Sequence, residues 1–149
     1  LGLTAGQGAG NGLDADALSV VDLTAKPIRT VDYVPIGPVP ESIEISPDGR
    51  LVAAVLMNGS NLPVDDPNRS EEGAVVLLER KGKTFRKVQE LPVGRIPEGV
   101  AFTSDGRRLI VQCHPARELW VFGVRRARLT KPESKIQVPG MPSSLRSAP

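Results

Sequence analysis

One stretch of the sequence occurs twice, and this repeat limits the fold more than any other feature. Residues 36–50, IGPVPESIEISPDGR, return as residues 93–107, VGRIPEGVAFTSDGR, and residues 138–145, VPGMPSSL, begin a third copy. Each complete copy contains a Gly/Pro turn, a short alternating segment and an Asp-Gly turn, which is the pattern of a β-strand between two turns. The sequence therefore predicts a protein built from repeated strand units.

The spacing of the copies predicts the size of the repeated unit. Pro40 and Pro97 are 57 positions apart, whereas Pro97 and Pro142 are 45 positions apart. The longer first copy contains a polar insert at residues 58–73, so the difference lies in a loop. A period of about 45 residues with four short strands is typical of a propeller blade. A β-sandwich is the alternative architecture, and the repeat argues against it.

Apolar runs and alternating runs predict the individual strands. The predicted strands are residues 18–23, 28–33, 42–46, 51–56, 74–79, 85–91, 99–103, 109–113, 118–124 and 134–138, with residues 1–3 as the tail of a further strand. Residues 51–56 are apolar on both faces of their strand, so we expect other sheets to cover both sides.

Composition argues against several classes of protein. The formal net charge is only +2 and 3% of the residues are aromatic, so neither the basic surface nor the stacking platforms of a nucleic-acid binder are expected. The single cysteine excludes an internal disulfide. No apolar run approaches the roughly 18 residues that cross a bilayer. The N-terminus has no Met and no signal-peptide pattern, and we expect the chain to start inside a repeat of a longer protein.

The repeated residues resemble a known family of bacterial β-propellers. The segment Val93–Gly106 carries the pattern VGxxPxGVAxxSDG, and Val20–Asp22 has the Val-Val-Asp ending of a propeller strand. These residues are similar to the YVTN-type repeat family, which includes the YncE-like periplasmic proteins and the lactonase-like seven-bladed propellers. The pattern is specific for the propeller class, and many different activities share it.

The resemblance implies an all-β propeller segment with about two and a half four-stranded antiparallel blades. Residues 1–34 are expected to form the outer half of one blade, residues 40–91 a full blade with the insert at 58–73, residues 97–138 a second full blade, and residues 142–149 the start of the next. A closed ring needs about four to eight blades. The remaining blades are expected from the same longer chain or from self-association.

The resemblance also implies three alternative functions. The leading hypothesis is a non-catalytic scaffold that binds a protein or a small molecule at the mouth of the propeller channel. The first alternative is a lactonase-like hydrolase that opens a sugar lactone there, and the second is the propeller of a redox protein that holds a haem or quinone. By the same resemblance the protein is expected in the bacterial periplasm or outside the cell.

Two repeated carboxylates are the first candidates for chemistry. Glu41, Glu98 and Ser143 follow the proline in the three copies, which places them at equivalent points of the channel mouth. Converging carboxylates raise one pKa and attract cations, so Glu41 and Glu98 are candidate acid/base groups or metal ligands. The alternative is that they are solvated charges at the starts of two strands.

The insert contains a weak calcium-binding pattern. Asp66, Asn68, Ser70 and Glu72 occupy alternate positions, as in the start of a calcium loop. The required glycine is absent, because Glu71 stands in its place. Asp66, Asn68 and Glu72 are therefore candidate calcium ligands, with a mobile solvated loop as the alternative, and no other cofactor is expected.

The only histidine is a third candidate. His114 follows Cys113 at the end of a predicted strand, and neighbouring strand residues point to opposite faces, so a catalytic Cys-His pair is not expected. His114 by itself is a candidate general base or metal ligand beside Glu98 and the insert. The alternative is a loop histidine with a structural hydrogen bond.

Two further patterns have ordinary explanations. Basic clusters at residues 81–83, 86–87 and 125–128 predict one slightly positive rim, which could contact phosphate or consist of solvated edge charges. The glycine-rich residues 6–12 resemble a phosphate loop but lack its lysine and precede a strand. We interpret this stretch as a flexible loop.

Overall fold

The computed structural model describes residues 1–6 and 14–147, which form three antiparallel sheets. The first sheet has the order β1 (Gly2–Gly6), β2 (Asp16–Asp22), β3 (Arg29–Gly37). The second has the order β4 (Pro40–Ile45), β5 (Leu51–Leu56), β6 (Gly73–Lys81), β7 (Thr84–Val93). The third has the order β8 (Pro97–Phe102), β9 (Arg108–Cys113), β10 (Glu118–Arg125), β11 (Arg128–Gln137).

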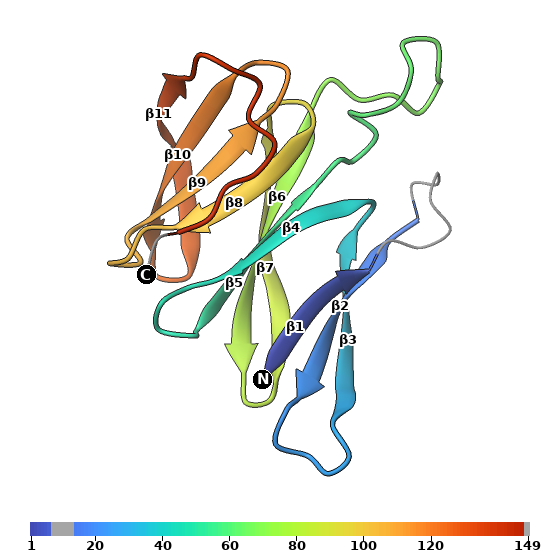
Figure 1. Ribbon diagram of the computed structural model, residues 1–149, viewed down its shortest axis with the longest axis vertical. Coiled ribbons are helices and arrows are strands. Elements are labelled where there is room, and N and C mark those ends of the chain that lie inside the picture. The colour runs from blue at the N-terminus through green and yellow to red at the C-terminus, as the bar shows by residue number, and fades with distance from the viewer. Residues whose placement is uncertain (7–13, 148–149) are drawn as a thin grey trace.

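Each four-stranded sheet is a meander in which neighbours in the sequence are neighbours in the sheet. Figure 1 shows the sheets fanned around one side of the molecule, with β4 and β8 toward the same side. This arrangement confirms the predicted all-β fold class with propeller blades. The part of the chain that the structure describes has no helix capable of spanning a membrane.

The second sheet lies between the other two, and its central strands explain why. All six residues of β5, Leu51–Leu56, are buried. Val52, Ala54 and Leu56 pack with the first sheet, whereas Leu51, Ala53 and Val55 pack with the third. The prediction that both faces of residues 51–56 are covered is confirmed. These two apolar layers hold the three sheets together.

The Asp-Gly turns of the two copies are built in the same way. Asp48 Oδ1 accepts hydrogen bonds from Ser46 Oγ at 2.6 Å and from the Arg50 amide at 3.0 Å, and Gly49 supplies the left-handed backbone, with φ of 68°. Corresponding contacts recur in the second copy among Thr103, Asp105 and Arg107. The repeated aspartate and glycine thus close the inner hairpin of each sheet.

The residue before each repeated proline has an unusual backbone. Val39 and Ile96 adopt φ of 52° and 49°, a region that β-branched residues rarely occupy. In both cases a side chain from an earlier part of the chain stabilises this backbone by accepting a hydrogen bond from the amide. The Val39 amide donates to Asp16 Oδ2 at 2.9 Å, and the Ile96 amide donates to Ser60 Oγ at 2.9 Å.

Several segments differ from the sequence-based expectation. β11 covers Arg128–Gln137 and not only residues 134–138, because a bulge and Pro132 interrupt the alternating pattern that identifies strands. The first strand is longer than predicted, since β1 pairs with β2 over Gly2–Gly6 and not only up to residue 3, and β3 continues to Gly37. Most of the glycine-rich stretch, residues 7–13, lies outside the described residues.

The third copy packs on the third sheet without forming a strand. Residues 141–147 have no regular structure, and this tail runs beside β8 in Figure 1. A Cβ atom at Gly99 would lie 2.7 Å from the Leu145 amide nitrogen, which shows how closely the tail approaches β8. The Ser147 hydroxyl donates to Glu44 Oε1 at 2.9 Å. The tail therefore lies along the inner strands.

Candidate functional site

Two candidate residues meet in the third sheet where β8 begins and β9 ends, the end of the sheet that the resemblance assigns to the channel mouth. Glu98 lies near the start of β8, and His114 follows the end of β9, which pairs with β8 through Pro97 and Cys113. The His114 Nδ1 and Glu98 Oε2 atoms are 3.6 Å apart, and 29% and 26% of the two side chains are exposed. The structure thus forms a partly buried carboxylate and imidazole pair.

Gln112, which no sequence motif marks as a site residue, joins this pair. Its side chain is fully buried, and its Nε2 donates to the Pro142 carbonyl of the tail. His114 Nδ1 lies 3.0 Å from the same carbonyl oxygen. Gln112 Oε1 is buried and has no hydrogen-bond partner among the described residues. We call Glu98, Gln112 and His114 the mouth cluster.

The first copy has no equivalent of the mouth cluster. At the same positions of the repeat, Glu41 corresponds to Glu98, but Val55 and Met57 replace the glutamine and the histidine. Glu41 is exposed at the start of β4, and Ser143 is exposed in the tail. Of the three equivalent positions after proline, the second is therefore the one that the structure pairs with an imidazole.

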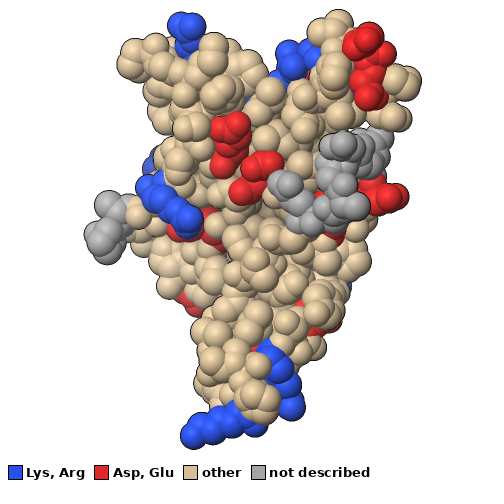
Figure 2. Space-filling model, turned by 45° about the vertical axis from the view of Figure 1, so that its right-hand side comes forward, with Lys and Arg blue, Asp and Glu red and all other residues tan. Residues whose placement is uncertain are grey.

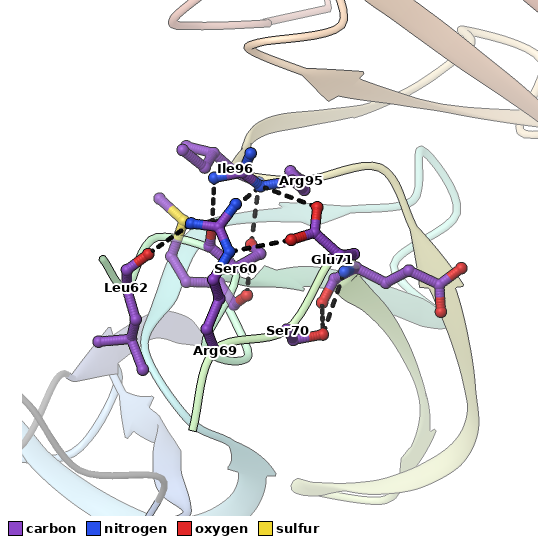
Figure 3. A network of polar contacts seen from close by, with 9 residues as sticks. Ser60, Leu62, Arg69, Ser70, Glu71, Arg95 and Ile96 are labelled. Atoms are coloured by element: carbon purple, nitrogen blue, oxygen red, sulfur yellow. Dashed lines mark hydrogen bonds and ion pairs between the residues drawn. The ribbon is translucent and has the colours of Figure 1, made fainter. Parts of the chain in front are cut away.

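The insert between β5 and β6 folds against the loop that leads into β8 (Figure 3). Arg69 donates to Glu71 Oε1 at 2.9 Å and to the Leu62 carbonyl at 2.8 Å. Arg95 Nη2 donates to the Ser60 carbonyl at 3.2 Å and lies near Glu71 Oε2 through its Nε at 3.9 Å. The hydrogen bond from Arg69 lowers the pKa of Glu71. These contacts attach the insert to the third sheet.

The candidate calcium ligands form turns inside this insert. The Asp66 carboxylate accepts a hydrogen bond from the Asn68 amide at 2.8 Å, and the Glu72 amide donates to Ser70 Oγ at 3.0 Å. No group of three or more His, Cys, Asp or Glu residues that could hold a metal ion occurs in the described ranges 1–6 and 14–147. Calcium binding by Asp66, Asn68 and Glu72 stays a prediction.

Cys113 serves the packing of the third sheet. It is completely buried, and a Cβ atom at Gly94 would lie 2.8 Å from its Sγ. Burial raises the pKa of the thiol to about 11, so the thiol is protonated at neutral pH. A protonated, buried thiol is a poor nucleophile. The residue next to it, His114, is the one that reaches the channel mouth.

Comparisons with known proteins find similarity in structure and not in sequence. No protein-family model matches the chain, and the search of curated proteins gives no significant match. The chain is similar to a candidate 6-phosphogluconolactonase from Bacteroides fragilis, with a TM-score of 0.69 and 20% identity, over 86% of this chain and 35% of that one.

A second similar structure is hydrazine synthase from Kuenenia stuttgartiensis, with a TM-score of 0.71 and 17% identity, over 97% of this chain and 48% of that one. The chain therefore spans between a third and a half of the solved chains that it matches. The likeness establishes an all-β fold that resembles part of lactonase-like propeller proteins. At these identities it shows the fold alone.

Proposed function

We propose that this chain is the blade-forming part of a YVTN-type, YncE-like propeller that acts as a non-catalytic binding or interaction scaffold. The ligand, a small molecule or a segment of a partner protein, would bind at the channel mouth beside the mouth cluster. By the resemblance of the repeat, the protein would work in the periplasm or outside the cell. The observation that carries the proposal is the 3.6 Å pairing of Glu98 with His114.

The repeat itself supplies the argument that the mouth cluster serves binding. Val55 and Met57 occupy two of the equivalent positions in the first copy and are buried there, so a blade of this kind folds with apolar residues at those places. In the third sheet, Gln112 Oε1 is buried without a partner in the described part of the chain. Such an unsatisfied group costs about 1–3 kcal/mol. The presence of polar residues at this cost supports a role beyond packing.

The mouth cluster also indicates which chemistry a ligand would need. Gln112 donates to a carbonyl oxygen of the tail, and the His114 ring nitrogen lies within hydrogen-bonding distance of the same oxygen, so carbonyl groups fit this place. Glu98 offers a carboxylate that accepts hydrogen bonds from hydroxyl or ammonium groups. A polar ligand with both carbonyl and hydroxyl groups, such as a sugar acid or a peptide, satisfies these requirements.

Hydrolysis of a sugar lactone is the second candidate function. A carboxylate and an imidazole that lie 3.6 Å apart are groups that can remove a proton from water and return it to the alcohol released when the ring ester bond breaks. The likeness to a candidate 6-phosphogluconolactonase favours this chemistry over other hydrolyses. Because the same fold supports many activities, the likeness is a weaker argument than the pair itself.

A redox propeller is the third candidate. The likeness to hydrazine synthase suggests it, and His114, the only histidine of the chain, could supply one axial ligand to a haem. A second ligand would come from outside this chain. We therefore rank this function below binding and hydrolysis.

The single histidine allows a direct test. Every imidazole proton signal in an NMR spectrum of this chain belongs to His114, so these signals report on the channel mouth alone. Titration with sodium gluconate and with glucono-1,5-lactone is expected to shift the His114 signals, while the lactone disappears no faster than in buffer. Accelerated loss of lactone would support the hydrolase instead, and unchanged His114 signals with both probes would contradict binding of sugar acids at the mouth.

Substitutions taken from the repeat give matched controls. Glu98→Gln keeps the shape of the side chain and removes its charge, and it should weaken gluconate binding. Glu41→Gln changes the equivalent residue of the first copy and should leave binding unchanged. If lactone hydrolysis occurs, His114→Met, which introduces the residue of the first copy, should abolish it.

A further inference from the structure

Basic side chains gather at the end of the molecule opposite the channel mouth. This end consists of the turns that join β2 to β3, β4 to β5, β6 to β7, β8 to β9 and β10 to β11. We call it the basic end, and its lysines and arginines are Lys26, Arg29, Arg50, Arg80, Lys81, Lys83, Arg86, Arg107, Arg108, Arg125, Arg126 and Arg128. All of them are exposed.

The turns of the basic end lie together in the folded chain. A cavity of about 260 Å³ lies where the β4–β5, β8–β9 and β10–β11 turns meet, and Arg50 and Arg126 are among its lining residues. The β6–β7 turn contacts the first sheet through Lys83 and Asp22, whose charged atoms are 3.2 Å apart. Figure 2 shows Lys and Arg at the lower tip, where the β2–β3 turn lies in Figure 1, and most of the visible Asp and Glu above the middle.

The carboxylates of the basic end are occupied by local contacts. Hydrogen bonds from Thr24, Ser46 and Thr103 lower the pKa values of Asp22, Asp48 and Asp105, respectively. Glu79 is paired with Lys81 at 2.8 Å. In the described ranges, several arginines and lysines of this end form no ion pair, among them Lys26, Arg29, Arg50, Arg107, Arg125 and Arg126. The basic end therefore has an excess of positive charge.

The mouth end has the opposite charge. Its loops and strand ends contain Asp14, Asp16, Glu41, Asp65, Asp66, Glu71, Glu72, Glu98 and Glu118, and its basic residues are Arg69, Arg95 and Arg117. The formal net charge of +2 is thus the difference between two oppositely charged ends. A charge separation of this kind orients a molecule in the field of a charged surface.

Two exposed aliphatic residues indicate the kind of surface. Leu23 and Ile28 lie in the β2–β3 turn on either side of Lys26, and 52% and 62% of these two residues are exposed. Exposed aliphatic groups among lysines and arginines are typical of protein surfaces that lie at a membrane interface. A nucleic acid is less favoured, because only 3% of the residues are aromatic and stacking on bases would be scarce.

We propose that the basic end docks on an anionic lipid bilayer, with its lysines and arginines at the headgroup phosphates and Leu23 and Ile28 in the interface. The basic residues come from turns of all three sheets, which suits an extended flat surface better than a narrow groove. In this orientation the channel mouth faces away from the lipid. The inference is independent of the proposed ligand at the mouth.

Sedimentation with vesicles tests this docking. The chain is expected to bind vesicles of phosphatidylglycerol and phosphatidylcholine in equal parts and to dissociate from them as the salt concentration rises. It should not bind vesicles of phosphatidylcholine alone. The triple variant Lys26→Gln, Arg107→Gln, Arg126→Gln removes one unpaired cation from the first sheet and two from the third. Its partition coefficient should fall about a hundredfold, since each basic residue near an anionic surface contributes about a factor of five.

A second triple variant is the control for net charge. Arg117→Gln, Lys131→Gln, Arg146→Gln changes the charge by the same amount outside the basic end and should change binding less than threefold. The double variant Leu23→Ser, Ile28→Ser should weaken binding about tenfold. Circular dichroism establishes that each variant is folded.

Several results would overturn the proposal. Equal binding to neutral vesicles, or equal losses in the two triple variants, would mean that the basic end does not recognise anionic lipid. Binding of inorganic phosphate or of an oligonucleotide without binding to vesicles would assign the basic end to a soluble anion. The His114 signals should be unchanged by vesicles, so failure of the lipid proposal and failure of the mouth proposal are separate outcomes.

Discussion

The second and third sheets are two versions of one blade, and they differ mainly at the channel mouth. Both have an aspartate that closes the inner hairpin, at Asp48 and Asp105, and both have a left-handed residue before the repeated proline. At the mouth, Met57 of the second sheet is replaced by His114, and a folded insert is replaced by a short turn.

This difference separates the residues that make a blade from those that give it an individual role. The shared residues act within a hairpin or at a joint between sheets, where every blade meets the same geometric requirements. The residues that differ lie where the blade meets solvent or a ligand. Substitutions that exchange or remove these features therefore test which positions are equivalent in the two sheets.

The largest difference in stability between equivalent substitutions in the two sheets is expected in the core. Leu77 pairs with Ala53 and Val121 pairs with Ile110, so the two residues have the same place in their sheets. Leu77 is fully buried between the second and third sheets, and Leu77→Ala should lower the free energy of unfolding by about 3 kcal/mol. Val121 is 7% exposed on the other side of its sheet, and Val121→Ala should cost about half as much. Urea denaturation measures both, and equal losses would contradict the central position of the second sheet.

The next largest effect is expected where the tail touches β8. The first copy has Ser42 at the position of Gly99. A Cβ atom at Gly99 would lie 2.6 Å from Gln112 Oε1 and 2.7 Å from the Leu145 amide nitrogen. Gly99→Ser should therefore cost about 2 kcal/mol and displace the tail.

Trypsin provides the second measurement for this variant, because displacement should expose the bond after Arg146 to faster cleavage. The reciprocal change, Ser42→Gly, should cost less than about 1 kcal/mol and leave cleavage unaffected. An unchanged cleavage rate in Gly99→Ser would show that the tail does not pack on β8.

A smaller effect is expected at the joint between the insert and the third sheet. Ser60 is fully buried, its hydroxyl donates to the Met57 carbonyl at 2.6 Å, and it accepts from the Ile96 amide at 2.9 Å. Ser60→Ala leaves that amide without its acceptor and should cost about 1.5 kcal/mol. Ser70→Ala, in a partly exposed turn of the insert, should change the free energy of unfolding by less than about 0.5 kcal/mol. A similar loss of stability in both variants would contradict the role of Ser60 in holding the Ile96 amide.

The smallest effect is a shared response to acid. The hydroxyl groups of Ser46 and Thr103 lower the pKa values of Asp48 and Asp105 in the folded state. A lowered folded-state pKa contributes stability that is present above the unfolded-state pKa, near 4, and is lost as pH falls through the folded-state value. The double variant Asp48→Asn, Asp105→Asn should therefore lose less stability between about pH 4 and pH 2.

Thermal unfolding followed against pH measures this slope. Either single substitution should produce about half of the change if the two turns are equivalent, as their hydrogen bonds indicate. Asp65→Asn, in the insert and outside both turns, is the control and should leave the slope unaltered. A change in only one of the two turn variants would mean that the copies respond to acid differently.

The features that the sequence could predict depend on residues close to one another in the chain. The Asp-Gly turns, the alternating inner strands and the doubly covered run Leu51–Leu56 all follow from local patterns, and the structure has them. The start of β11 was harder to predict because Pro132 and a bulge interrupt its alternation. Local patterns are sufficient where turns and periodicity determine the structure.

The candidate site depends on contacts that a local pattern does not contain. Gln112 looks like an ordinary strand residue until its contact with Pro142 is known, and only its mismatch with Val55 in the repeat could have indicated it. In the insert, the alternating pattern of polar residues points to Glu72, whereas Glu71 makes the ion pairs with Arg69 and Arg95. Bulk charge was equally uninformative, because opposite charges at the two ends nearly cancel.

The left-handed residues before the prolines have a consequence for how a ring of blades is ordered. Val39 depends on Asp16 and Ile96 depends on Ser60, and each acceptor comes from chain that precedes the loop that it holds. A blade moved next to a foreign neighbour would keep its hairpins but lose that acceptor. These contacts therefore favour one order of neighbouring blades. Because each acceptor precedes its donor in the chain, the preceding blade is synthesised before the blade that it stabilises.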